Sequence, residues 1–422
     1  MDLIVGAGIS GLGYAASTPN DYQLIERSND IGGYCKTFYN GEYVWDCAGH
    51  FFHFQHPELR DFVMSNIPDE EVIQVRKQTQ IYYKGRLIDY PFQMNIHQLE
   101  QQEFIDCLYD LFNIPEEADS PASTFKQMLY AKFGKSIAEK FLIPYNGKLY
   151  ATDLDKLDVD AMGRFFPYAN KEQIIRNFRN PSSQSYNATF LHPLRGCIRI
   201  IDSVASHVDM KRVTLGEELI AIDMKQHTAQ TTRRMLTYDR LISSIPFPQL
   251  LSLCSVNYDP AIYSCNKVLV FNLGFDKKGP ERQNNWIYYP DPSLVFYRVG
   301  FYDNILQQDR MSLYVEIGFG QGDQVPPADT LLERVLDDLR KIGVLTDQRL
   351  EAYNTVLMDP AYVHITHQSE TDKAEKMALL SNNDIYSIGR YGAWKYCSLE
   401  DNLHDAIQLA EKLSQQKDSL HL

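Results

Sequence analysis

The sequence of 422 residues has few of the features that mark secreted or membrane-embedded proteins. Its seven cysteines are odd in number and scattered, and no two form a Cys-x-x-Cys pair, so we expect neither a disulfide framework nor a zinc site. No stretch approaches the ~20 apolar residues that a membrane-spanning helix needs. The first apolar strand starts at the N-terminus, so we expect no signal peptide. We therefore predict a cytoplasmic protein with reduced cysteines and no membrane span.

Positive charge is also scarce. The chain has 41 lysine and arginine residues against 55 aspartate and glutamate residues, which gives a formal net charge of −14. This balance argues against a nucleic-acid partner, and an anionic ligand would need locally placed arginines. His364 and His367 have a spacing that could fit a metal, but no third ligand is apparent, so we predict no metal site.

A glycine-rich fingerprint opens the chain. The apolar run 3–5 is followed by Gly6, Gly8 and Gly11, in the pattern Gly-x-Gly-x-x-Gly. In this pattern the first glycine makes a tight turn, the second lets the backbone approach a pyrophosphate, and the third lets the following helix lie against the strand. Glu26 follows Gly6 by 20 residues, at the end of a second apolar run, where a carboxylate accepts from ribose hydroxyls. We therefore predict a bound dinucleotide.

The residues after this fingerprint favour FAD over NAD. Glu26 and Arg27 are followed by Gly32 and Gly33, which give a second close backbone approach to the pyrophosphate. This pattern resembles FAD proteins of the glutathione-reductase-like superfamily. An acidic side chain at position 26 also argues against a 2′-phosphate. The predicted cofactor is therefore FAD.

The remaining pattern predicts both strands and helices. We expect a β-hairpin at 80–90, helices between 98 and 180, and a strand-rich region at 266–319 that forms one antiparallel sheet. A last strand at 385–390 and a helix at 401–416, beginning at an Asp-Asn cap, close the chain.

The predicted fold class is α/β: a Rossmann-like FAD-binding domain with a parallel sheet, a helical insert, and a larger antiparallel-sheet domain. Both ends of the chain contribute to the first domain, so a ligand should lie where the domains meet. The predicted boundaries are 1–80 with 200–250 and 380–422 for the FAD-binding domain, 98–180 for the helical substrate-binding insert, and 81–97 with 181–199 and 255–379 for the sheet domain, which also binds substrate.

Further motifs follow one another along the chain. They are Gly49-His50-Phe51-Phe52-His53, Tyr90-Pro91-Phe92-Gln93, Phe141-x-x-Pro144-Tyr145-Asn146-x-Lys148, Asn187-Ala188-Thr189-Phe190, Trp286-x-Tyr288, Phe296-Tyr297-Arg298 and Gly389-Arg390-Tyr391-Gly392-x-Trp394-Lys395-Tyr396. In this order they resemble the motifs of flavin-dependent UDP-galactopyranose mutases, the eukaryotic-type branch more than the bacterial one. These enzymes lie within the FAD-binding amine-oxidase/glutathione-reductase-like superfamily.

The resemblance implies a reaction without net redox change. In that family, N5 of the reduced flavin attacks the anomeric carbon of a nucleotide sugar, most often UDP-galactopyranose or UDP-galactofuranose, and the sugar ring recloses in the other size. The galactofuranose serves cell-surface polysaccharide biosynthesis. The flavin must first be reduced, by NAD(P)H or another reductant, and the sequence holds no second dinucleotide fingerprint.

The resemblance also implies roles for individual residues. As catalytic residues it gives His50, Arg164 and Arg298, the two arginines clamping the diphosphate. As cofactor-binding residues it adds to the fingerprint Gly49, His50, Gly389, Arg390, Asp401 and Asn402. As substrate-binding residues it gives Tyr90, Phe92, Gln93, Phe141, Asn146, Tyr150, Arg164, Asn187, Tyr288, Arg298, Tyr362 and Tyr396. Tyr150 departs from the family, which usually has tryptophan there.

Each role has a structural alternative. Arg298 could instead belong to a partly buried ion pair, His50 could be a core histidine, and Asp401 could simply cap a helix. The alternative function is an FAD-dependent oxidase or desaturase of the amine-oxidase/protoporphyrinogen-oxidase type, which would share the residues from Gly6 to Gly33. A flavin-binding scaffold without catalysis is a third class. The sequence leaves the nucleotide, the sugar and the oligomeric state open.

Overall fold

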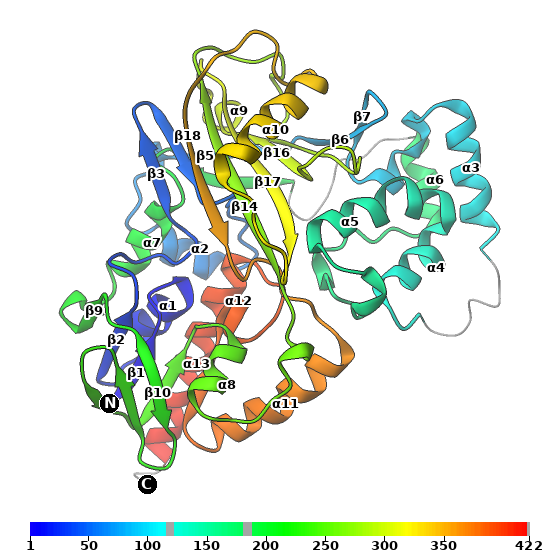
Figure 1. The fold of residues 1–422 in the computed structure, drawn as a ribbon. Helices are drawn as coiled ribbons and strands as arrows, with labels where there is room; N and C mark the ends of the chain where they lie inside the picture. The colour runs from blue at the N-terminus through cyan, green and yellow to red at the C-terminus, as the bar shows by residue number, and fades with distance from the viewer. Residues whose placement is uncertain (115–121, 180–187, 420–422) are drawn as a thin grey trace.

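The computed structural model describes residues 1–114, 122–179 and 188–419, and it has three parts (Figure 1). A parallel sheet flanked by helices lies at the lower left, where both termini are found. A tall sheet stands above it, and a group of helices lies to the right. The predicted class, a parallel-sheet domain with a helical insert and a larger second sheet, is confirmed. The predicted domain boundaries stay a prediction.

The parallel sheet is built from both ends of the chain. Its strand order is β19-β13-β1-β2-β9, and every neighbouring pair is parallel. The central strand β1 is fully buried, which explains its apolar run 3–5. Ile4 packs against helices on one face, and Leu3 and Val5 pack on the other face against a small sheet at 219–237 and the helix at 247–253. The five strands are β1 (Asp2–Val5), β2 (Tyr22–Glu26), β9 (Val213–Leu215), β13 (Arg240–Ser243) and β19 (Ile385–Ser387).

The second sheet has seven strands in the order β18-β14-β17-β16-β15-β6-β7. The sequence predicted an antiparallel sheet, and one pair corrects this, because β6 lies parallel to β15. The reason is topological: the hairpin β6–β7 comes from a distant part of the chain and joins the edge at β15. The strands are β6 (Thr79–Tyr83), β7 (Arg86–Asp89), β14 (Asn266–Phe275), β15 (Trp286–Tyr288), β16 (Arg298–Phe301), β17 (Ser312–Gly320) and β18 (Leu350–Met358).

Both faces of this sheet are covered. Val268 and Val270 on β14 belong to the core cluster that includes the helical insert. The alternate residues Leu269 and Phe271 belong to a second cluster with α10 (Ala328–Lys341). This two-residue alternation is what a strand buried on both sides requires.

The helical insert comprises α3 (Gln101–Phe112), α4 (Phe125–Ile137), the π-helical turn Ala138–Leu142, α5 (Ile143–Tyr150) and α6 (Lys171–Arg179). The chain kinks at Gly134, which has φ +74°. A Cβ there would lie 2.7 Å from the carbonyl oxygen of Asp110 on α3, so only glycine permits this close crossing.

The remaining α-helices and strands complete the fold. The helices are α1 (Ile9–Ser17), α2 (Pro57–Met64), α7 (Ile198–Ala205), α8 (Phe247–Leu253), α9 (Tyr302–Ile305), α11 (His367–Ser381), α12 (Gly389–Gly392) and α13 (Leu399–Ser419). The strands are β3 (Thr37–Asn40), β4 (Tyr43–Asp46), β5 (Val72–Arg76), β8 (Thr189–Pro193), β10 (Leu219–Asp223), β11 (Thr228–Thr231) and β12 (Met235–Thr237). None of the helices in the described ranges is both long enough and apolar enough to cross a bilayer.

The closing helix corrects one prediction. α13 begins at Leu399, two residues before the predicted Asp-Asn cap. Ser398 is the capping residue: its hydroxyl accepts from the backbone N–H of Asp401 at 3.0 Å, and the Asp401 carboxylate accepts from the Ser398 N–H at 2.8 Å. The aspartate thus completes a reciprocal cap from inside the first turn instead of starting the helix.

Candidate functional site

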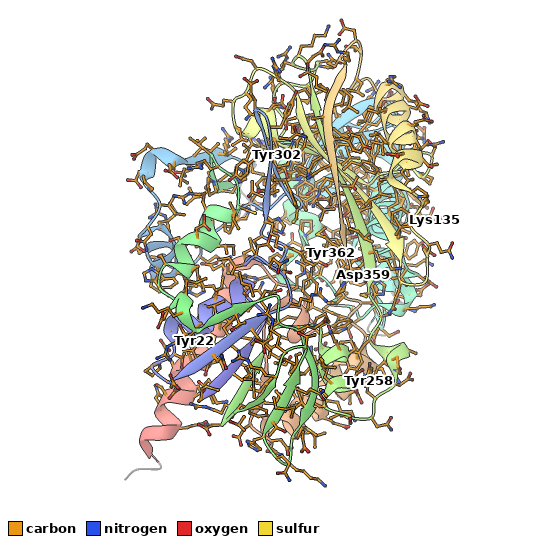
Figure 2. All side chains as sticks on the ribbon, turned by 60° about the vertical axis from the view of Figure 1, so that its left-hand side comes forward. Tyr22, Lys135, Tyr258, Tyr302, Asp359 and Tyr362 are labelled. Carbon is orange, nitrogen blue, oxygen red and sulfur yellow. The ribbon has the colours of Figure 1, made fainter. Side chains whose placement is uncertain are left out.

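A cavity of about 560 Å³ lies where the parallel sheet meets the seven-stranded sheet. Its lining gathers the carboxyl ends of several parallel strands, including Gly6 after β1, Glu26 on β2, Ser244 after β13 and Gly389 after β19. In open α/β sheets this edge is where ligands bind. Figure 2 labels Tyr362 and Asp359, two lining residues, at the junction of the two sheets.

The three fingerprint glycines differ in what surrounds them. Gly6 has φ +102°, and a Cβ there would lie 2.4 Å from Oγ of Ser244. A Cβ on Gly11 would lie 1.9 Å from the carbonyl oxygen of Gly6, so this glycine brings α1 against β1. A Cβ on Gly8 would meet no protein atom within 4 Å. Gly8 therefore faces the open cavity, where a ligand backbone can approach the N-terminus of α1.

Glu26 is fixed by the turn itself. Its Oε2 accepts from the Ala7 N–H and its Oε1 from the Ser28 N–H, both at 2.8 Å. Each oxygen keeps a second lone pair for ribose hydroxyls. Arg27 lines the cavity beside it, as do Gly32 and Gly33.

At the far end of the cavity, α12 and α13 hold Arg390. Its backbone N–H donates to Oδ1 of Asn402 at 2.6 Å. Its guanidinium lies over two stacked rings, 4.7 Å from the centre of Tyr396 and 5.2 Å from that of Tyr362. Nε is buried without a partner, and Nη1 donates to the Cys397 carbonyl at 3.3 Å. Within the described residues no carboxylate pairs with this buried cation, so an anionic or carbonyl-bearing ligand would suit it.

His50 lies in the lining between these ends. Burial lowers the pKa of its imidazole, so the ring is neutral at pH 7, and Nδ1 is buried without a partner. Gly49 lets the loop pass close to the sheet, since a Cβ there would lie 2.5 Å from the Tyr314 hydroxyl. Phe51 stacks on Trp286 at 5.0 Å between ring centres. The loop is thus held by aromatic packing on one side and faces the cavity on the other.

Arg298 also lines the cavity, beside Tyr297 and Glu316. Its Nε donates to Oε2 of Glu316 at 2.9 Å and its Nη2 to Oε1 at 2.5 Å. The ion pair that the sequence left as an alternative is therefore present. It occupies one edge of the guanidinium and leaves Nη1 for a ligand.

Arg164 lies outside the cavity lining. It sits in the short turn Gly163–Phe165, where its Nη2 pairs with Asp401 at 2.6 Å and its Nη1 donates to Gln55 at 2.7 Å. Asp401 is likewise outside the lining, whereas Phe165 contributes to it. The structure thus brings Arg164 and Asp401 together as a partly exposed ion pair between the helical insert and α13.

Five predicted or adjacent aromatic residues form one continuous series of ring contacts, the aromatic cluster, in which two contacts are stacked, one is edge-on and one is tilted. Ring centres are 5.2 Å apart between Phe92 and Phe141, 5.2 Å between Phe141 and Tyr145, 5.0 Å between Tyr145 and Tyr288, and 5.2 Å between Tyr288 and Tyr90. None of the five is in the cavity lining. They join the helical insert to the sheet.

Some polar atoms near this aromatic cluster have no hydrogen-bond partner. They are buried and comprise Oε1 of Gln93, Oδ1 of Asn146, the Tyr150 hydroxyl, Nε1 of Trp286 and the Tyr297 hydroxyl. Burying such atoms unpaired costs about 1–3 kcal/mol each, and of these five residues only Tyr297 lines the cavity. Asn187, also predicted to bind substrate, lies outside the described residues.

Several lining residues were not found from the sequence. They include Tyr34, Glu217, Ser244, Gln249, Glu316 and Asp359. Ser244 could have been found, because it follows a strand that rejoins the parallel sheet. Glu316 sits in the middle of a long apolar strand, and its pairing with Arg298 is visible only from the register.

Several known proteins resemble this chain in sequence or in fold. The model of NAD(P)-binding Rossmann-like domains matches residues 4–65. A coproporphyrinogen III oxidase of Staphylococcus aureus is 21% identical over 324 residues, which cover 67% of this chain and 69% of the oxidase. Reduced UDP-galactopyranose mutase superposes with a TM-score of 0.89 at 23% identity, over 98% of this chain and 95% of that one. A structure assigned as a protoporphyrinogen oxidase of Exiguobacterium superposes with 0.78 at 17% identity, over 98% of both chains.

These likenesses establish the fold. The chain shares its fold with these two structures, and its first 65 residues contain the Rossmann-like segment that the glycine fingerprint predicted. Because a mutase and an oxidase both superpose over nearly the whole chain, the fold alone does not select the reaction.

Proposed function

We propose that this chain is an FAD-dependent nucleotide-sugar mutase that interconverts pyranose and furanose forms, with UDP-galactopyranose and UDP-galactofuranose as the first substrates to test. The observation that carries the proposal is the aromatic cluster with the unpartnered amide oxygens of Gln93 and Asn146, near a cavity lined by Arg298 and Arg390. Aromatic faces bind a nucleobase, buried amides bind its edge, and arginines bind a diphosphate. The proposed setting is the cytoplasm, with NAD(P)H as reductant.

The residues of the cavity fit FAD. Glu26 would bind the adenosine ribose, Gly8 and the N-terminus of α1 the pyrophosphate, and Arg390 the flavin ring. When bound and reduced, the flavin supplies a nucleophilic nitrogen for the anomeric carbon. Nε of Arg390 is buried without a partner, and an acceptor atom of the flavin ring would satisfy it, because a buried cation needs a counter-charge or an acceptor.

Side chains of the protein would bind the diphosphate, orient the base and exclude water. Arg298, held flat by Glu316, would present Nη1 to the diphosphate and stabilise its charge as it leaves. Gln93 and Asn146 would orient the base, and the neighbouring rings would exclude water. Neutral His50 would border the reacting carbon without adding a positive charge there.

An oxidase is the second candidate, favoured by the similarity to the coproporphyrinogen III oxidase. An amine substrate fits poorly, because the space over Tyr362 and Tyr396, two stacked rings, already holds the guanidinium of Arg390. A porphyrinogen fits the charge better, since its carboxylates would suit arginines. The unpartnered amide oxygens of Gln93 and Asn146, near the aromatic cluster, have no role in such a reaction.

A binding experiment separates the two. The purified protein, with its flavin content measured, is titrated calorimetrically with UDP and, in a parallel sample, supplied with coproporphyrinogen III under air. The mutase proposal expects stoichiometric UDP binding and no porphyrin formation. Porphyrin formation with peroxide release, and no heat from UDP, would overturn it.

A further inference from the structure

A buried carboxylate lies directly beneath the His50 loop. Asp46, at the end of β4, is 1% exposed. Its Oδ1 accepts from the Thr37 hydroxyl at 2.6 Å and from the Cys197 N–H at 2.9 Å. Its Oδ2 is buried without a partner. A carboxylate with one free oxygen in the core is costly unless a cation or a donor can reach it.

The group that faces this oxygen is an imidazole. His192 on β8 is also 1% exposed, and its Nε2 lies 3.9 Å from Oδ2 of Asp46. That distance is too long for a hydrogen bond, but it allows strong attraction when the ring is protonated, because few waters screen the pair. Nδ1 of His192 has no partner, and the ring meets Phe51 edge-on at 5.8 Å. The ring also lies within hydrogen-bonding reach of the His50 backbone carbonyl, so His192 contacts the His50 loop on one side and Asp46 on the other.

The pair is mechanically joined to the loop that lines the cavity. Backbone hydrogen bonds link Phe52 and Leu191 in both directions, at 3.2 and 2.9 Å, so β8 and the loop move together. Tyr302, labelled in Figure 2, accepts from the Asp46 N–H at 3.2 Å and donates to the Ala48 carbonyl at 3.3 Å. The loop from Ala48 to Phe52 is therefore held from below by the elements that carry the two titratable groups.

We propose that Asp46 and His192 form a buried positioning pair that binds one proton when negative charge develops in the cavity beside His50. The inference rests on the proposed flavin site: two-electron reduction places negative charge on the flavin ring, and the pair takes up a proton from solvent as that charge appears. The reductant, dithionite or a nicotinamide, supplies both electrons. One proton goes to the flavin and one to the pair, so charge within the site is conserved.

The direction of the effect follows from the surroundings. Burial lowers the pKa of His192, while Asp46 and the His50 carbonyl raise it, and the net shift is downward. The imidazole is therefore neutral at pH 7 in the absence of added charge. A negative charge in the cavity stabilises the imidazolium and moves its pKa upward. The pair therefore takes up its proton only after the flavin has been reduced.

Apart from His50, the titratable groups around the pair do not compete for this proton. Burial raises the pKa of the Tyr302 phenol and of three nearby thiols, so all four stay neutral near pH 7; the thiols are those of Cys35, Cys47 and Cys197. On the cavity side, burial lowers the pKa of His50, Asp46 raises it and Arg390 lowers it, and this ring also is neutral before charge develops. Because His50 lines the cavity, the His192→Phe variant is what separates the two imidazoles.

The test is the pH dependence of the flavin midpoint potential in the holoprotein. For a two-electron couple, one proton per reduction gives a slope of about −30 mV per pH unit and two protons about −59 mV, from the constant of 29.6 mV per tenfold change. The wild type should show the steeper slope between pH 5.5 and 7.5. The His192→Phe variant, which keeps the ring packing against Phe51, should show the shallower one.

A matched control exists in the same chain. His227 and Asp384 lie 4.0 Å apart, with side chains 35% and 49% exposed, and His227 stacks on Tyr238 at 5.3 Å. Because this pair is solvated, His227→Phe should leave the slope unchanged. Equal slopes in the wild type and His192→Phe would overturn the proposal.

A second readout covers other outcomes. The imidazole signals of His192, assigned by their loss in His192→Phe, are followed by NMR at pH 6.5 before and after dithionite reduction. A shift toward the protonated form on reduction is expected, and no shift contradicts the pair. Mutase turnover together with equal slopes in the wild type and His192→Phe would refute only the buried pair. Unequal slopes without mutase turnover would refute only the proposed mutase function. If His192→Phe does not fold, His192→Gln replaces it; protein without flavin would refute both.

Discussion

Arg298 and Glu316 face each other across adjacent strands of the seven-stranded sheet, in register between β16 and β17. Two hydrogen bonds, of 2.9 and 2.5 Å, hold the guanidinium against the carboxylate in the cavity lining. The carboxylate is 1% exposed and the arginine side chain 19% exposed. Glu316 therefore fixes the plane of the guanidinium while leaving one edge toward the cavity.

Removing the arginine should separate its two roles. Arg298→Ala should retain flavin but weaken UDP binding by about 1.5–3 kcal/mol, the value of a hydrogen bond to a charged group. It should also lower the free energy of unfolding by about 3–5 kcal/mol, because Glu316 is left buried and unpaired. Calorimetry with UDP and chemical denaturation measure the two effects.

The double variant Arg298→Met/Glu316→Gln is the control for that experiment. With no unpaired buried charge it should recover most of the stability and none of the UDP affinity. Wild-type affinity for UDP in either variant would remove Arg298 from the diphosphate site.

Three glycines predict three different outcomes on replacement by alanine. Gly11→Ala should destabilise the fold by about 1–3 kcal/mol, because the new Cβ would lie 1.9 Å from the Gly6 carbonyl oxygen. Gly8→Ala should fold and lose flavin affinity at least tenfold, because its Cβ would occupy the ligand's space. Gly322→Ala, with no atom within 4 Å and no role in the cavity, should change neither. Thermal unfolding and flavin retention on dialysis distinguish them; full flavin binding by Gly8→Ala would contradict the pyrophosphate assignment.

Variants of Arg164 and Asp401 would show whether Arg164 binds the diphosphate in addition to forming its ion pair. As a partly exposed pair at 2.6 Å it should contribute only about 0–1 kcal/mol to stability. If Arg164 serves as the second clamp, Arg164→Ala should weaken UDP binding tenfold or more, whereas Asp401→Asn should leave it intact or slightly stronger. Equal UDP affinities in all three proteins would confine Arg164 to a structural role.

Buried histidines should make the fold sensitive to acid. Burial lowers the pKa of His50, His192 and His364, whereas the unfolded chain has the ordinary value of about 6.5. Below that pH the unfolded state binds more protons than the folded state, so stability falls as the pH decreases. Thermal unfolding between pH 7.5 and 5 should show a falling Tm below about 6.5. A Tm that rises or stays level over that range would contradict neutral buried imidazoles.

The sequence predicted local structure best at positions where only one residue type meets the physical requirement. The glycines at 6, 8 and 11 and the acid at 26 predicted the turn, the helix and the strand end, because close backbone approach and a fixed carboxylate tolerate no substitute. The parallel sheet followed from the same pattern. These features are local, and local sequence carries them.

Features set by pairing between distant segments could not be read in the same way. β6 joins β15 in parallel because of how a hairpin docks, and Glu316 meets Arg298 through strand register. The start of α13 at Leu399 depends on Ser398, whose hydroxyl competes with the more conspicuous Asp401 as a cap. The partner of Arg164 lies 237 residues away in the chain.

The most direct measurement is turnover of the flavin-loaded protein with UDP-galactofuranose under anaerobic conditions, before and after dithionite reduction, with products separated by chromatography. The account predicts UDP-galactopyranose from the reduced protein and none from the oxidised protein, with Arg298→Ala strongly impaired. No conversion by the reduced protein, together with oxidation of a porphyrinogen in air, would contradict it.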